Sequence, residues 1–227
     1  MALSSSPRLH QAGLIVLDAA SGRLLRTIAL QYNPDALTRT LQAQASGGAG
    51  GDAERSQPLR LKGPAVETLR LEAEIDAADG LEQPDRNANV VRYGIGPQLA
   101  ALESLVNPEV QTLLAQYREA GKGTLEVIPP EAPLVLFVWG PERVLPVRVS
   151  EFSITEQAFD PQLNPLRAQV SLVLRVLSSD DLGHNHRGGG IFLDHLRRRE
   201  ALAGKTGAAQ LSQLGRASCR ERVCYVV

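Results

Sequence analysis

The sequence predicts a mainly β domain, a β-sandwich or half-barrel, that carries a helical insertion of one or two α-helices. Apolar and polar residues alternate without a fault over residues 68–77, which is the period of a strand with one buried face. Two further stretches, 133–140 and 168–176, have strand length and are rich in Val and Leu. Helical spacing with capping residues marks residues 96–121 as the insertion.

The N-terminal part predicts a hairpin, then a corner, then another strand. Residues 13–32 contain an apolar run, a turn and a longer alternating strand. Asn33-Pro34 ends that strand, because proline restricts its own φ and disfavours a helical conformation of the residue before it. The alternation resumes over residues 37–43, where Arg39 lies among the residues phased inward.

The strand at 68–77 has two unlike faces. One face is apolar and is predicted to join the core. The other is a row of charged and polar residues that includes three carboxylates: Glu72, Glu74 and Asp76.

Two helices are predicted at 96–106 and 107–121. The second begins with Asn107 as N-cap and a following proline, and it ends at Gly121. Its apolar residues have helical spacing and predict one buried stripe. The stripe consists of Val110, Leu113, Leu114 and Tyr117.

The second half of the β domain predicts strands at 124–130, at 133–140, from Val144 onward and at 168–176. The apolar phase shifts by one residue near Ser150-Glu151, which predicts a bulge or bend. Together with the N-terminal strands this makes seven or eight strands around one helical insertion.

The predicted domain organisation is a β domain at 1–178, a linker with a short basic helix at 179–203, and a tail at 204–227. At 227 residues and 43% hydrophobic, the chain suffices for one such domain and an appendage. The tail is predicted to be disordered or an artefact of a truncated sequence, because it lacks periodicity and holds both cysteines, Cys219 and Cys224. Apolar runs are shorter than the roughly 18 residues of a membrane helix, which predicts synthesis in the cytoplasm and no membrane insertion.

Candidate reactive groups are few. The His-Asn-His run at 184–186 lies beside a triple glycine, and solvated histidines are favoured over a nuclease motif or over a metal site completed by His195. The Gly-Ile-Gly run at 94–96 lacks the third glycine of a dinucleotide fingerprint and is interpreted as the start of a helix. We therefore expect no catalytic residue, no cofactor and no metal.

Five segments, taken together, resemble the tube-protein family of contractile injection systems. The resemblance covers about residues 13–202, and the segments occur in the family's order with its gaps. It is closest to the tube-initiator or baseplate-adaptor members, many of which carry a LysM module that is absent after Ala203. The segments are QYNPDALTRTLQ, GPAVETLRLEAEIDAADGLE, GIGPQLAALESLVNP, VLFVWG and AFDPQLNPLRAQVSLVLRVL.

The resemblance implies a fold of the phage tail-tube type and a structural role. The subunit would form a homo-oligomeric ring, a hexamer in the family, that connects the spike and baseplate hub to the inner tube and templates tube assembly. It would then be part of a contractile particle, in the cytoplasm or released. The corner, the inward arginine and the acidic row are the expected assembly interface: Asn33, Pro34, Arg39, Glu72, Glu74 and Asp76.

Two other classes of function are alternatives. A carbohydrate-associated or hydrolytic protein of the cell envelope would use the acidic face at Glu72, Glu74 and Asp76 for acid/base chemistry, since side chains two residues apart on a strand share a face. A solvated or lumen-facing surface explains the same row more simply. Nucleic-acid binding by the basic C-terminal part is disfavoured, because aromatic residues make up only 4% of the chain.

Overall fold

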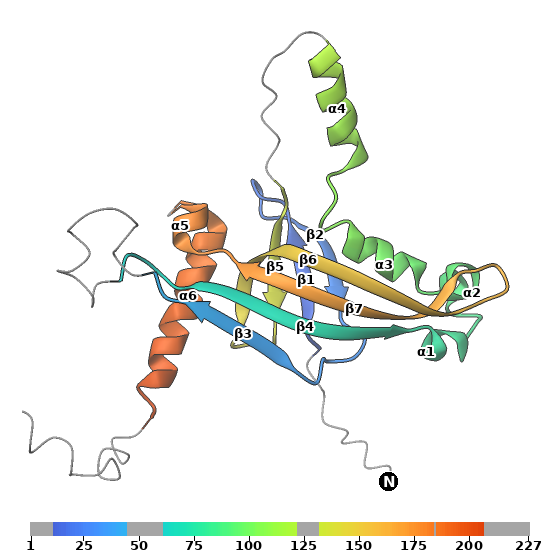
Figure 1. Cartoon of the computed structure of the whole chain (residues 1–227), viewed down its shortest axis with the longest axis horizontal. Helices are drawn as coiled ribbons and strands as arrows, with labels where there is room; N and C mark the ends of the chain where they lie inside the picture. The colour runs from blue at the N-terminus through green and yellow to red at the C-terminus, as the bar shows by residue number, and fades with distance from the viewer. Residues whose placement is uncertain (1–10, 45–60, 122–131, 184, 207–227) are drawn as a thin grey trace, which may run out of the picture.

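The computed structural model describes residues 11–44, 61–121, 132–183 and 185–206, and its centre is one antiparallel sheet of seven strands (Figure 1). The order across the sheet is β2-β1-β5-β6-β7-β4-β3. The mainly β class is confirmed, as an open sheet with β2 and β3 at its edges. The strands are β1 (Gly13–Leu17), β2 (Leu24–Ala29), β3 (Leu37–Gln42), β4 (Val66–Asp76), β5 (Leu134–Val138), β6 (Val144–Phe159) and β7 (Pro165–Val176).

Helical segments lie between β4 and β5 and after β7. Between β4 and β5 the described residues form four helices, so the prediction of one or two helices is wrong. The short segments have no helical periodicity long enough to detect in sequence. The helices are α1 (Ala78–Leu81), α2 (Ala88–Tyr93), α3 (Gly96–Glu103), α4 (Val110–Gly121), α5 (Ser179–Leu182) and α6 (Arg187–Ala203).

The predicted hairpin and corner are both confirmed. β1 and β2 pair antiparallel from Gly13 opposite Ala29, and the chain then leaves the β2 strand through Asn33-Pro34 before β3 begins. The Oδ1 atom of Asn33 accepts the backbone N–H of Ala12 at 2.8 Å. This hydrogen bond holds the corner against the start of β1.

β6 joins the two halves of the sheet. Its 16 residues pair first with β5 and then with β7, and Val147 is opposite both Val135 and Val176. The predicted bulge is confirmed by a register shift between Val149 and Glu151. The extra residue changes which side chains of β6 face the core.

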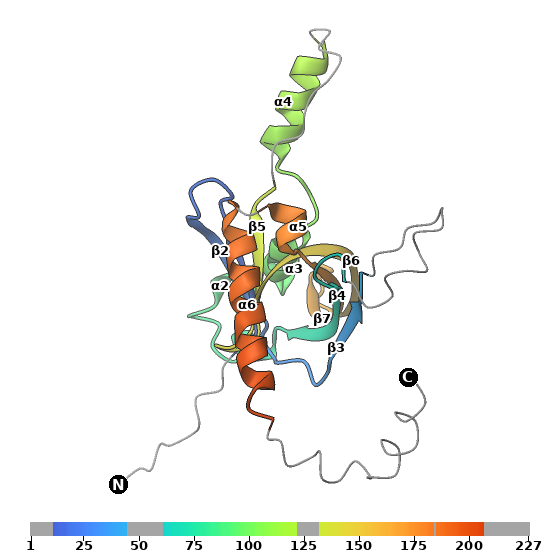
Figure 2. The same cartoon turned by 90° about the vertical axis from the view of Figure 1, so that its left-hand side faces the viewer.

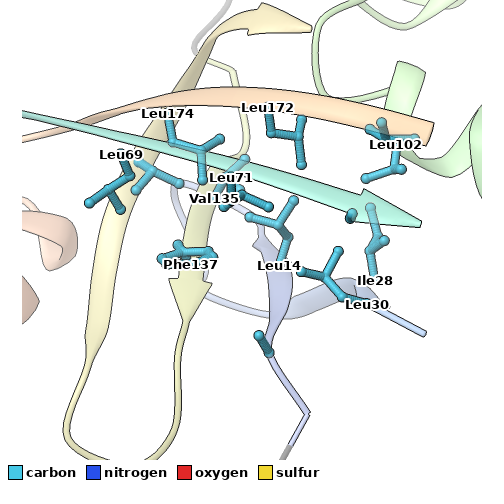
Figure 3. Close-up of a cluster of buried hydrophobic side chains, with 14 of the residues drawn as sticks. Leu14, Ile28, Leu30, Leu69, Leu71, Leu102, Val135, Phe137, Leu172 and Leu174 are labelled. Atoms are coloured by element: carbon cyan, nitrogen blue, oxygen red, sulfur yellow. The ribbon is translucent and has the colours of Figure 1, made fainter. Parts of the chain in front are cut away.

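One apolar core fills the inner face of the curved sheet. Side chains from β1 and β5, such as Leu14 and Phe137, lie across from side chains of β4 and β7, such as Leu71 and Leu172 (Figure 3). The predicted inward rows of β4 and β7 are confirmed, and every member is at most 5% exposed. These rows are Leu69, Leu71, Ala73 and Ile75 in β4 with Ala77 directly after it, and Ala168, Val170, Leu172, Leu174 and Val176 in β7.

The segment after β7 contains the predicted short basic helix as part of α6, but residues predicted as a linker form α5 and the first turn of α6. Ser178 caps α5 through a capping box with Asp181, and α6 already begins at Arg187. Phe192 of α6 is 3% exposed and belongs to the core. A Cβ atom at Gly189 would lie 2.7 Å from the carbonyl oxygen of Gly183, so part of the triple glycine permits the close approach of α6 to the end of α5.

The helix predicted at 107–121 exists as α4, but its predicted burial is wrong. Val110, Leu114 and Tyr117 are 68%, 42% and 73% exposed. Figures 1 and 2 show α4 standing away from the sheet. An amphipathic stripe indicates a face that suits an apolar partner, but it does not identify the partner. The strand predicted at 124–130 lies outside the described residues.

Packing of α6 into the core predicts a large difference between two substitutions. Phe192→Ala should lower the free energy of unfolding by about 3–5 kcal/mol, because it leaves a cavity in the core. Leu114→Ala, on exposed α4, should change it by less than about 0.5 kcal/mol. Urea denaturation of both variants measures the two values. Similar losses in the two variants would show that α6 is not part of the core or that α4 is docked.

Candidate functional site

An open groove of about 530 Å³ lies where the Asn33-Pro34 corner passes the edge of β4. It brings together four of the six residues predicted for the assembly interface: Asn33, Pro34, Glu72 and Glu74. The groove lining does not include Arg39 or Asp76. The complete lining is Tyr32, Asn33, Pro34, Asp35, Ala36, Thr38, Arg70, Leu71, Glu72, Ala73, Glu74 and Gln169.

The groove exists because β3 is shorter than the strand that it pairs with. β3 pairs with β4 only as far as Leu37 opposite Leu71, whereas β7 pairs with β4 as far as Asp76. Within the described part of the chain, residues 72–76 of β4 therefore have a neighbouring strand on one side only. The corner before β3 turns the chain away from this stretch and forms the other wall of the groove.

The open side of β4 presents backbone groups. The N–H of Ala77 donates to the carbonyl of Leu166, which precedes the buried part of β7, at 2.8 Å. The N–H of Asp76 points the other way and donates to the Gln31 side chain at 2.9 Å. Since backbone groups alternate in direction along a strand, those of Glu72 and Glu74 face the open side. An unpaired edge of this kind is a template for a strand of another chain.

The three carboxylates of β4 have different environments. Glu74 lies 3.4 Å from Arg167, and Asp76 makes a closer pair with Arg167 at 2.6 Å. The backbone N–H of Ala78 lowers the pKa of Asp76, and Arg167 lowers it further. Asp76 is therefore an ionised residue that joins β4 to β7 and starts α1. Of the three, Glu72 and Glu74 line the groove, and Asp35 joins them from the corner.

Arg39 is engaged within its own chain. Its Nε and Nη2 atoms both lie 2.6 Å from Oε1 of Glu67, and the side chains are 18% and 7% exposed. The inward phase predicted for Arg39 is confirmed, and its partner is a carboxylate on the inner face of β4. Its part in the assembly interface stays a prediction, and the ion pair with Glu67 engages its guanidinium within the chain.

The exposed face of α4 is a candidate contact surface that the sequence interpretation missed. The sequence shows the apolar stripe, but its helical spacing predicts burial in the core and not a contact surface. Monomeric proteins rarely leave such contiguous apolar side chains in water. The face is formed by Val110, Leu114 and Tyr117.

The other sequence motifs have structural roles where they are described. The Gly-Ile-Gly run is confirmed as the start of α3, because Ile95 is its N-cap and Gly96 its first residue. Gly94 ends α2 with φ +58°, where a side chain would clash with the carbonyl of Pro165. His195 is 4% exposed, which makes the prediction of a solvated side chain wrong for this residue. His184 lies outside the described residues. Within the described ranges, no group of His, Cys, Asp and Glu side chains could hold a metal ion.

Comparison with models of protein families finds no match to this chain, and comparison with curated proteins finds no relative. Among the helices in the described part of the chain, none combines the length and apolar character needed to cross a bilayer.

The buried His195 predicts a pH-dependent stability. Burial lowers its pKa below the ordinary value of 6.5, Glu67 opposes this shift, and the charges of Arg199, Arg39 and Arg143 add to it. The unfolded chain therefore binds this proton at a higher pH than the folded chain does. The stability from neutral His195 is complete above the unfolded pKa and is lost as the pH falls toward the folded pKa.

We expect the Tm of the wild type to fall more steeply from pH 7 to pH 5 than the Tm of His195→Gln. This interval covers about one pH unit on either side of the unfolded pKa of histidine. Thermal melts across this range measure the two slopes. Parallel profiles would contradict the assignment, since all other titrating groups are common to both proteins.

Proposed function

We propose that this protein is a structural ring subunit of a phage-tail-like contractile injection system. Its fold would be of the tail-tube type, and the ring would connect the spike and baseplate hub to the inner tube and template tube assembly. The observation that carries the proposal is the open edge of β4 beside the Asn33-Pro34 corner. The resemblance of the five sequence segments supplies the family context, including the hexamer and the particle.

An open edge suits a ring because each subunit has a second edge to offer. β2 is the outer strand at the opposite end of the sheet order. Pairing β2 of one subunit with residues 72–76 of the next would be a heterologous contact, and such contacts repeat until a ring closes. Closure would remove both free edges, which otherwise favour aggregation.

Charge on the two edges supports this pairing. Three carboxylates, Glu72, Glu74 and Asp35, line the groove beside the open edge of β4 against one arginine, Arg70. Arg26 lies on exposed β2, and Arg23 directly precedes that strand. Opposite charges of this kind favour encounter of unlike edges and disfavour pairing of two like edges.

The exposed face of α4 would supply a second contact. It lies outside the sheet and stands away from it (Figure 2). An apolar helix face gains stability when a neighbouring subunit or the next ring covers it. Edge pairing would then set the direction of assembly, and the helix would strengthen the contact.

The environment of the carboxylates favours this role over hydrolysis. A general acid at neutral pH needs a raised pKa, whereas hydrogen bonds and Arg167 lower that of Asp76. Glu74 faces the same arginine at 3.4 Å. We therefore propose a protein that is not an enzyme and that needs no cofactor. Its partners would be copies of itself, the inner tube protein, and spike, hub and baseplate proteins.

The open edge predicts a charge-reversal phenotype. Glu72→Lys/Glu74→Lys should prevent ring formation, because like charges would then meet on the two edges. Its Tm should stay within about 2 °C of the wild type, because surface substitutions change stability little. Light scattering and electron microscopy measure assembly, and Glu82→Lys is the matched control at an exposed carboxylate of another segment.

Rings of the wild type and of Glu82→Lys, with a monomeric double variant, would support the proposal. A wild type that remains monomeric and hydrolyses glycans, with activity lost in the double variant, would instead establish the envelope-hydrolase alternative.

The α4 face predicts a separate effect on affinity. Leu114→Ser/Tyr117→Ser should weaken self-association about tenfold or more, equivalent to about 1.4 kcal/mol, without loss of the fold. Sedimentation analysis over a concentration series measures the change. Ala115→Ser, on another face of α4, is the control. If it weakens self-association equally, the effect comes from a disturbed helix and not from loss of the apolar face.

A further inference from the structure

A charged cluster lies beyond the apolar core, where α6 meets the strands. Four elements contribute to it. Arg39 and Glu67 come from the inner faces of β3 and β4, Arg143 from the turn between β5 and β6, and His195 and Arg199 from α6. The inner row of β4 thus changes from apolar to charged at this end of the sheet.

Hydrogen bonds fix the parts of the cluster relative to one another. Arg39 is held by Glu67 through two nitrogen atoms at 2.6 Å. Arg198 Nη1 on α6 donates to the carbonyl of Pro141 at 3.0 Å. The N–H of Trp139 donates to the carbonyl of Arg143 at 2.8 Å, which closes the same turn. The turn with Arg143 therefore lies against the part of α6 that carries Arg199.

The cluster holds three guanidinium groups and one carboxylate. Glu67 is already the partner of Arg39. Within the described ranges, no carboxylate lies within ion-pair distance of Arg143 or Arg199. Burial lowers the pKa of Arg143, the charges of Arg39 and Arg199 lower it further, and Glu67 opposes the shift. The cluster therefore has an excess of positive charge in a partly desolvated place.

A second observation concerns the imidazole of His195. The side chain is 4% exposed, and its Nδ1 atom has no hydrogen-bond partner among the described residues. Buried polar atoms nearly always have a partner, because an unmade hydrogen bond costs stability. Arg143 is half-buried and Arg199 is exposed, so a small group can reach the cluster from solvent.

We propose that this cluster binds an oxyanion, with Arg143 and Arg199 as the charged donors and His195 as a buried donor. Arg39, which Glu67 orients, adds positive charge without giving up its own partner. Guanidinium groups suit carboxylate and phosphate oxygens because their N–H donors match these planar or tetrahedral anions. The anion is either a free phosphate-type ion or a carboxylate of a partner protein, and this site does not depend on the proposed function.

Thermal melts of the full chain test the proposal, with inorganic phosphate and acetate as separate probes. Sodium chloride keeps the ionic strength constant in every sample. At ten times the dissociation constant we expect Tm to rise by about 3 °C. Arg143→Gln/Arg199→Gln should lose the rise. Arg197→Gln, which removes an exposed arginine of the same helix, should retain it and reports any general effect of the salt.

A single variant and a second measurement keep the test decisive if the double variant does not fold. Arg199 is exposed on α6, so Arg199→Gln alone should fold and should weaken phosphate binding about tenfold, as one lost charge-assisted hydrogen bond implies. The ¹⁵N resonance of His195 Nδ1 should shift on titration in the wild type. A response to phosphate indicates a free ion, and a response to acetate alone indicates a protein carboxylate. Equal responses in the wild type, Arg199→Gln and Arg197→Gln, or no shift at His195, would overturn the site.

Discussion

The double pairing of β6 is the constraint on which the rest of the structure depends. One strand pairs with β5 at its start and with β7 from Val147 onward, and its register with β7 shifts between Val149 and Glu151. Without that shift, the side chains after it would face the opposite side of the sheet. With it, both halves of the sheet direct apolar side chains into a single core, and α6 adds Phe192 to that core.

The open edge exists because the two strands that flank β4 pair with it over different lengths. β7 pairs with β4 as far as Asp76, but the Asn33-Pro34 corner makes β3 begin opposite Leu71. The unpaired stretch is therefore a consequence of where a proline restricts the chain, and Glu72 and Glu74 lie on it. The corner that delays the start of β3 thus exposes the stretch of β4 on which the proposed assembly would depend.

Much of the sheet could be predicted from sequence, because β4 and β7 alternate strictly. The groove could not, since no pattern shows that Leu37 pairs with Leu71. The sequence pattern predicts the Asn33-Pro34 corner and the carboxylates Glu72 and Glu74, which the structure brings to one groove, but it could not reveal that Glu67 holds Arg39 from 28 positions away. The apolar stripe of α4 predicts a buried face, and the glycines at the start of α6 predict a linker because glycines usually interrupt helices.

Hydrogen–deuterium exchange at the amides of Glu72 and Glu74 tests most directly whether the β4 edge is the assembly surface. The account predicts that both amides exchange rapidly in the monomer and become protected in the assembled ring, because a strand of the next subunit would accept their hydrogen bonds. The amides of Leu71 and Ala73, which face β7, should be protected in both states. Fast exchange at Glu72 and Glu74 in the assembled particle would contradict the account.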